Sequence, residues 1–151
     1  LKYYNENFGF NIATLKLFTP FGPKDDENKL IPYLILNRLR NNNVSLNNPN
    51  QIMDVIFVKD IVEAYLKASE NYNKFKDYSK FNVATGKTYE IKEIYNVINS
   101  SINNVSYELF ENRNIFANSK KINEILGWNA NTSLKDGLDF TIDYYRRKYD
   151  L

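Results

Sequence analysis

The spacing of hydrophobic residues along the chain predicts several short strands. Residues 12–18 alternate between apolar and polar side chains, as a half-buried strand does. Turn-forming residues at 19–23 are expected to end this strand, and a charged loop is expected at 24–28. The other strand candidates are short runs rich in β-branched or aromatic residues, at 44–46, 54–58, 81–83 and 105–110.

Segments with helical spacing lie between these strand candidates. Five segments place apolar residues on one helix face, and they are residues 30–36, 60–68, 90–99, 118–126 and 134–145. Gly127 is expected to end the fourth helix, and Ser133 with Asp136 forms a capping box for the last one. The inner face of the last helix is expected to consist of Leu134, Leu138, Ile142 and Tyr145. The pattern therefore predicts a mixed α/β architecture with short strands.

Acidic residues gather where the second helix is expected to begin. One hypothesis is that Asp54, Asp60 and Glu63 form a catalytic acid–base group. Capping the helix is the simpler role for Asp60 and Glu63, because acidic side chains stabilise a helix N-terminus. The buried face of this helix is expected to carry Ile61, Ala64, Tyr65 and Ala68.

Composition narrows the possible chemistry. The 151 residues suffice for one domain, and 15 % aromatic residues argue against disorder. The net charge of +2 is too small to indicate nucleic-acid or membrane binding, and no apolar stretch approaches the roughly 18 residues of a membrane span. The absence of Cys and His excludes a thiolate nucleophile, a Ser-His-Asp triad and an ordinary zinc site, so no metal site is expected. Nothing resembles a signal peptide, and we expect a cytoplasmic location.

Two further patterns have simple structural explanations. Residues 84–88 (ATGKT) partly match a phosphate-binding loop, but that motif needs an earlier glycine and position 81 is Phe. A turn that connects a strand to a helix is therefore the better interpretation. Residues 146–148 are basic at the expected end of a helix, where cations complement the helix dipole, which favours that role over a nucleic-acid patch.

Six motifs follow one another in a fixed order along the chain. They are LKLFTPFGP (15–23), LIPYLI (30–35), QIMDVIFVKDIV (51–62), FNVATG (81–86), NSKK (118–121), and LGW with SLKDGL (126–138). In this order they resemble the C-terminal half of the nucleotide-sugar epimerase/dehydratase family, the extended short-chain dehydrogenase/reductases. The resemblance is strongest to the hexose 4-epimerases, 4,6-dehydratases and 4-keto reductases that make deoxysugars for bacterial surface polysaccharides.

The resemblance implies an incomplete α/β fold. Residues 1–151 are expected to be a single fragment, namely the substrate-binding lobe and the last strand of a Rossmann-type parallel sheet. The N-terminal half, which binds the dinucleotide, is expected to be missing, since the chain begins at Leu1. The family's catalytic Tyr-x-x-x-Lys pair is expected in that half, because the residues four after Tyr3 and Tyr4 are Asn7 and Phe8. No catalytic residue is therefore assigned to this chain.

The resemblance also implies candidate binding residues. Leu17 takes the position of a cofactor contact. The substrate-binding positions are Thr19, Lys29, Leu30, Ser45, Leu46, Met53 and Arg113. Many members have an Arg where this chain has Met53, and a thioether cannot donate to a phosphate oxygen. Either Lys29, Lys59 or Arg113 compensates, or the substrate differs, or the gene is drifting.

These expectations give a leading interpretation and one alternative. The leading one is the substrate-binding part of an NAD(P)-dependent nucleotide-sugar epimerase, dehydratase or reductase. Such a parent would bind NAD or NADP, whereas the fragment is expected to bind no cofactor and to be inactive. Its partners would be the nucleotide-sugar and other copies of itself, since the strand at 12–18 is expected to lack neighbours. The alternative is a standalone, non-catalytic module that binds nucleotide-sugars or proteins.

Overall fold

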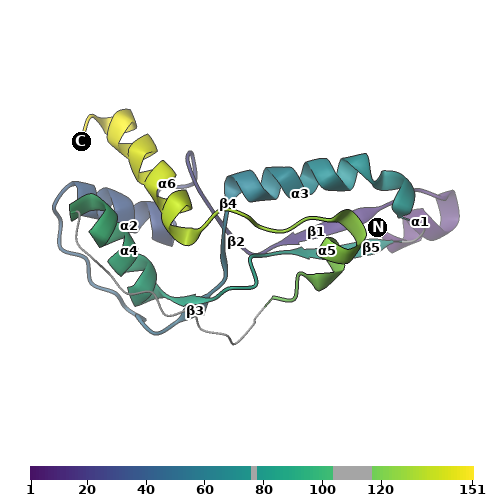
Figure 1. The fold of residues 1–151 in the computed structure, drawn as a ribbon, viewed down its shortest axis with the longest axis horizontal. Coiled ribbons are helices and arrows are strands. Elements are labelled where there is room, and N and C mark those ends of the chain that lie inside the picture. Colours follow the sequence, from purple (N-terminus) through teal and green to yellow (C-terminus); the bar gives the residue numbers. More distant parts are fainter. Residues whose placement is uncertain (76–77, 104–116) are drawn as a thin grey trace.

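The computed structural model describes residues 1–75, 78–103 and 117–151 (Figure 1). The elements are α1 (Lys2–Phe8), β1 (Ala13–Leu17), β2 (Thr19–Phe21), α2 (Leu30–Leu39), β3 (Ile52–Met53), β4 (Val55–Phe57), α3 (Val58–Glu70), the 3-10 helix η1 (Tyr72–Lys74), β5 (Ser79–Val83), β6 (Tyr89–Glu90), α4 (Ile91–Asn103), α5 (Lys120–Leu126) and α6 (Leu134–Tyr149). The mixed α/β architecture predicted from the sequence is confirmed.

The strands form three separate pairs. β1 and β5 are parallel, with Ala13 beside Ser79 at one end and Leu17 beside Val83 at the other. β2 and β4 are also parallel, while β3 and β6 are antiparallel. Parallel pairs need long crossover connections, which is why partners in these pairs lie tens of residues apart.

The elements group into two regions of an elongated molecule (Figure 1). The helical lobe consists of α2, α4 and α6, and its buried cluster includes Leu34, Ile98, Leu138 and Tyr145. The sheet lobe consists of β1, β5, α1, α3 and α5, and its buried cluster lies between the sheet and helices α3 and α5. β2 and β4 lie between the two lobes, so they tie the lobes together.

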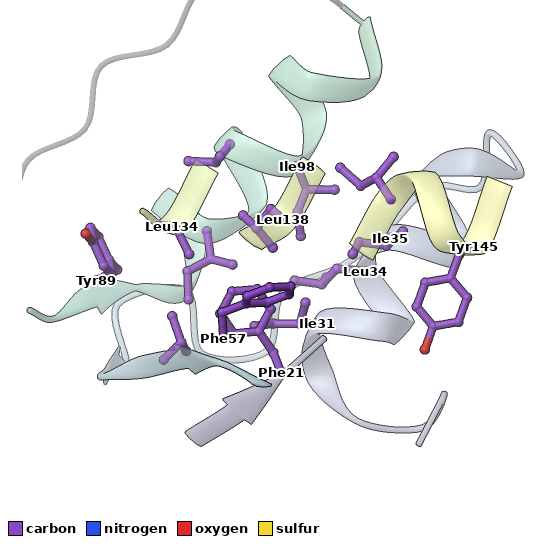
Figure 2. Close-up of a cluster of buried hydrophobic side chains, with 14 of the residues drawn as sticks. Phe21, Ile31, Leu34, Ile35, Phe57, Tyr89, Ile98, Leu134, Leu138 and Tyr145 are labelled. Carbon is purple, nitrogen blue, oxygen red and sulfur yellow. The ribbon is translucent and has the colours of Figure 1, made fainter. Parts of the chain in front are cut away.

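Helix α6 has the cap and the buried face predicted for it. The Ser133 side chain accepts a hydrogen bond from the backbone N–H of Asp136 at 3.1 Å, which satisfies one free donor of the first turn. The four residues predicted for its inner face, Leu134, Leu138, Ile142 and Tyr145, are all at most 8 % exposed. Figure 2 shows Leu134, Leu138 and Tyr145 within the cluster, with Tyr145 at the opposite end from Tyr89.

Gly137 lets α6 approach the strands closely. A Cβ at this position would lie 2.8 Å from the Phe21 ring and 3.2 Å from the Phe57 ring. A larger residue would therefore push α6 away from β2 and β4.

Three predictions about local structure are wrong. Residues 19–21 form strand β2 rather than a turn, because they pair with β4 far along the sequence. Residues 44–46 form no strand, since no strand within residues 1–75, 78–103 and 117–151 pairs with this short run. Tyr65 is 52 % exposed and does not belong to the buried face of α3. The predicted strand at 105–110 lies outside the described residues.

The expected acidic cap of α3 is also wrong. The helix begins at Val58, before both acidic residues, and its N-cap Phe57 provides no side-chain hydrogen bond. Asp60 lies in the first turn but points to a different segment, so its role is described with the candidate site below.

Candidate functional site

A cavity of about 290 Å³ lies beside the N-terminal half of α2. We call it the α2 cavity. Its lining residues are Leu30, Tyr33 and Leu34 from α2, Ser45, Leu46, Asn47, Asn48 and Gln51 from the following segment, and Ile91 at the start of α4. Three of the predicted substrate-binding residues, namely Leu30, Ser45 and Leu46, are therefore brought together here.

The walls of the α2 cavity differ in chemistry. Leu34 and Ile91 are buried and apolar, whereas the exposed wall formed by residues 45–51 carries a hydroxyl and several amide side chains. Tyr33 is 45 % exposed, so part of its aromatic ring is open to solvent. Such a slot can pack a flat ring against apolar groups while amides hydrogen-bond to its edge.

Backbone hydrogen bonds hold the polar wall in place. The N–H groups of Ile91 and Lys92 donate to the carbonyl oxygens of Gln51 and Pro49, each at 3.0 Å. The Lys92 ammonium also donates to the side-chain oxygen of Asn50 at 2.9 Å. The wall is therefore fastened to the start of α4, a rigid element of the helical lobe.

Lys29 immediately precedes the cavity. It occupies the N-cap position of α2, next to the lining residue Leu30, and its ammonium lies 2.7 Å from a carboxylate oxygen of Asp25. The hydrogen bond from Lys29 to the Asp25 carboxylate raises the pKa of Lys29. Lys29 therefore stays protonated and offers a cation beside the cavity.

The remaining predicted residues lie elsewhere. Leu17 ends β1 and is 37 % exposed, and Thr19 begins β2 with its N–H donating to the carbonyl oxygen of Asp54 at 3.2 Å. Met53 lies on β3, half-buried against the core of the helical lobe and outside the lining of the α2 cavity. Arg113 lies outside the described residues. The binding roles of all four stay predictions.

The structure gives Asp54 and Asp60 roles that the sequence did not indicate. Asp54 is 4 % exposed, and its carboxylate accepts from the N–H groups of Thr85 (3.0 Å) and Gly86 (2.9 Å) and from the Thr85 hydroxyl (2.7 Å). Two backbone N–H groups of the loop at 84–88, those of Thr85 and Gly86, therefore bind Asp54, which supports a structural turn over a phosphate-binding loop. A carboxylate bound in this way fixes a loop and is not positioned as an acid or base.

Asp60 makes a matching set of contacts. It is 2 % exposed and accepts from the N–H groups of Asn131 and Thr132, both at 3.2 Å, and from the Thr132 hydroxyl at 3.1 Å. Its own carbonyl oxygen accepts from the Trp128 indole N–H at 3.1 Å. Thr85, Lys87 and residues 130–135 line a cavity of about 390 Å³, so the two aspartates anchor two segments of its lining.

Two classes of site are not found within the described ranges. Residues 1–75, 78–103 and 117–151 contain no group of three or more acidic, Cys or His side chains that could hold a metal ion. No helix among them has the length and hydrophobicity to cross a membrane.

Comparison with known proteins decides the family. A sequence model of the NAD dependent epimerase/dehydratase family matches residues 1–84, which is more than half of the chain. The chain belongs to this NAD-dependent epimerase/dehydratase family. The resemblance noted in the sequence motifs is thereby confirmed.

Curated relatives support the same assignment. The chain is 32 % identical over 149 residues to CDP-abequose synthase from Salmonella typhimurium, covering 91 % of this chain and 49 % of that protein. It is 26 % identical over 151 residues to UDP-glucose 4-epimerase from Bacillus subtilis, covering 84 % of this chain and 44 % of that protein. The chain thus spans about half the length of the curated relatives it matches.

Solved structures confirm the Rossmann-type α/β fold. UDP-glucuronic acid 4-epimerase from Bacillus cereus, in complex with UDP-glucuronic acid and NAD, has a TM-score of 0.83 at 22 % identity, covering 97 % of this chain and 49 % of that one. WbmF from Bordetella bronchiseptica, in complex with NADH, has a TM-score of 0.84 at 21 % identity, covering 98 % and 49 %.

The residues of this chain can be compared with those that bind the NAD cofactor in such folds. A dinucleotide pyrophosphate in such folds is bound by closely spaced glycines at a helix N-terminus. The five glycines of this chain, at positions 9, 22, 86, 127 and 137, do not have that spacing. Leu17, at the carboxyl end of a parallel strand, offers only an apolar edge. The sequence therefore contains no glycine-rich loop of the kind that binds a dinucleotide pyrophosphate.

The family's Tyr-x-x-x-Lys spacing does occur in this chain, at Tyr72–Lys76 and Tyr144–Lys148. Lys148 is bound to Glu27 at 2.6 Å, and Tyr72 is 57 % exposed in η1. Lys76 lies outside the described residues. Neither Tyr72 nor Tyr144 lines the α2 cavity.

Proposed function

We propose that this chain holds the nucleotide-sugar substrate of an NAD-dependent epimerase, dehydratase or reductase. Membership of the family supports this proposal, and so do the names of its relatives, which include CDP-abequose synthase and UDP-sugar epimerases. The observation that carries it is the convergence of Leu30, Ser45 and Leu46 on the α2 cavity. We further propose deoxysugar synthesis in the bacterial cytoplasm as the setting.

The α2 cavity suits the nucleotide part of such a substrate. A pyrimidine ring would pack against the apolar groups of Leu34 and Leu46, with the amide of Gln51 at its polar edge. The diphosphate would lie toward Lys29, whose ammonium supplies the opposite charge. In this proposal Lys29 offsets the absence of an Arg at position 53.

Catalysis is not proposed for this chain by itself. Because the sequence has no glycine-rich pyrophosphate loop, we propose that hydride and proton transfer belong to the half of the family fold that this chain does not cover. The alternative is a standalone module that binds nucleotide-sugars or proteins without catalysis. The reading frame upstream of Leu1 separates the two, because a glycine-rich turn and a Tyr-x-x-x-Lys pair there would favour the enzyme.

Calorimetric titration of the chain with CDP and UDP tests the proposed binding. We expect dissociation constants at or below about 1 mM, which is some 4 kcal/mol of binding free energy. Ser45→Tyr should abolish binding by filling the cavity, while Ser69→Tyr on the exposed side of α3 serves as the matched control. Equal affinities for both variants would contradict the proposal.

A further inference from the structure

The last turns of α6 hold the loop that leads into α2. The Lys148 ammonium lies 2.6 Å from the Glu27 carboxylate, and the Tyr149 hydroxyl donates to the same carboxylate oxygen. One turn earlier, the Tyr145 hydroxyl donates to the backbone carbonyl oxygen of Asp25 at 3.1 Å. Three side chains of one helix therefore hold two residues of a loop about 120 positions away in sequence.

These contacts continue to Lys29 through Asp25. The backbone of Asp25 binds Tyr145, while its side chain, which is 16 % exposed, binds the Lys29 ammonium at 2.7 Å. The Lys29 N–H also donates to the carbonyl oxygen of Asp26 at 3.0 Å. The position of Lys29 thus depends on a loop whose own position is set by α6.

The α6 side of this contact is packed against neighbouring side chains. The rings of Tyr145 and Tyr149 are stacked, with centroids 6.5 Å apart and planes at 5°. The guanidinium of Arg40, which follows α2, lies 5.4 Å from the centroid of the Tyr149 ring. Figure 2 shows Tyr145 projecting from α6 beside α2 at one end of the buried cluster. The Tyr145 side chain is buried, so packing holds its hydroxyl in place.

We propose that Glu27 is a positioning residue, which through Lys148 and Tyr149 holds residues 25–29 so that Lys29 faces the diphosphate of a bound nucleotide. This inference rests on the proposed function, because it assumes that Lys29 contacts the diphosphate of a bound nucleotide. Glu27 itself need not touch that ligand.

The charge of Glu27 is maintained near neutral pH. Hydrogen bonds from Lys148 and Tyr149 lower the pKa of Glu27, and the hydrogen bond to Glu27 raises the pKa of Lys148. The charged or titratable groups around Glu27 are Lys148, Tyr149 and Tyr145 of α6, Arg40 after α2, and Asp25 of the loop. A folded-state pKa below the ordinary value of 4.5 means that the contact is complete above that value and is lost as the pH falls through the lowered pKa.

Binding measurements with Glu27→Gln test this inference, with Glu6→Gln as the matched control. Glu6 also forms an exposed pair with a lysine, Lys2 at 3.5 Å, but on α1 in the sheet lobe. We expect Glu27→Gln to weaken CDP or UDP binding about three- to tenfold and to leave binding of the uncharged nucleoside unchanged. The second expectation distinguishes a loss of Lys29 positioning from a general loosening of the α2 cavity.

A double-mutant cycle with Lys29→Met completes the test. If Glu27 acts through Lys29, Glu27→Gln should have no further effect on affinity in the Lys29→Met background. The Lys29 amide resonance should also move in Glu27→Gln and stay in place in Glu6→Gln. Wild-type affinity retained by Glu27→Gln, or additive losses in the cycle, would overturn this inference alone. A wild-type chain that binds neither CDP nor UDP would overturn the proposed function and this inference with it.

Discussion

The helical lobe and the sheet lobe differ in how completely they bury their apolar residues. In the helical lobe Leu34, Ile35, Ile98 and Leu138 have no exposed surface. The sheet lobe and its flanking helices expose many large apolar side chains, namely Tyr3, Tyr4, Phe8, Phe10, Leu17, Val58, Val62, Tyr65 and Leu66. Among the described residues, the helices of the helical lobe expose fewer large apolar side chains, namely Tyr33 and Phe140, so the larger apolar surface belongs to the sheet lobe.

Helix α3 shows this difference within one element. Its inner face packs Ile61, Ala64 and Ala68 against the sheet. Its outer face carries Val62 and Leu66, which are 51 % and 57 % exposed. Apolar patches of this kind on a soluble protein mark surfaces that contact other polypeptides. We therefore expect contacts between copies to involve the sheet lobe and to leave the α2 cavity open.

The largest effect is expected from a cavity in the core of the helical lobe. Leu138→Ala should lower the free energy of unfolding by about 2–5 kcal/mol, because Leu138 is completely buried. Leu66→Ala removes the same atoms from an exposed site and should change it by less than about 0.5 kcal/mol. Urea denaturation followed by tyrosine and tryptophan fluorescence measures both, and equal losses would contradict the difference between the lobes.

A smaller loss of stability is expected from Asp60→Ala. The change removes the charged acceptor of the part-buried N–H groups of Asn131 and Thr132, and a hydrogen bond to a charged group contributes about 1.5–3 kcal/mol. Asp139→Ala breaks only a surface ion pair with Lys135 and should cost less than about 1 kcal/mol. Thermal melting compares the two variants. An unchanged melting temperature in Asp60→Ala would contradict the anchoring role of the Asp60 carboxylate.

A substitution at position 53 is expected to change the affinity for nucleotides more than the stability of the fold. Met53 is half-buried, so the aliphatic part of an Arg can keep its packing while the guanidinium reaches outward. Met53→Arg should raise the affinity for CDP or UDP by up to about tenfold, in a salt-dependent way. A fall in melting temperature with no gain in affinity would exclude position 53 from the site, and Met53→Leu controls for the loss of the thioether.

The smallest effect concerns association between copies. Leu66→Lys places a charge on the outer face of α3 and should weaken self-association without lowering stability. Light scattering across a concentration series measures this, with Asn42→Lys beyond the end of α2 as the control. A monomer at all concentrations in the wild-type chain would rule out association through this surface.

Local features of the fold could be read from the sequence, and features that depend on distant partners could not. The cap and inner face of α6 were predicted because both follow from the spacing of residues within one helix. β2 was missed because residues 19–21 form a strand only by pairing with β4, more than thirty residues away. Asp60 was taken for a helix cap because its true partners lie about seventy residues further on.

The candidate site shows the same division. Leu30, Ser45 and Leu46 were assigned through the resemblance to the family, and all three line the α2 cavity. Tyr33 and Gln51 line it too and lie within two of the motifs, but no binding role was assigned to them, and Asn48 lies in none of the motifs. They reach the site only because α2 packs beside the start of α4, an arrangement that sequence spacing does not reveal.

Chemical-shift mapping of the isotope-labelled chain with CDP or UDP tests the central claim most directly. If the helical lobe holds the nucleotide, the largest shifts should occur at Leu30, Tyr33, Leu46 and Gln51, with the exposed residues of the sheet lobe unaffected. Shifts centred on residues 85–87 and 130–135, or on the surface of the sheet lobe, would contradict the placement of the substrate in the α2 cavity.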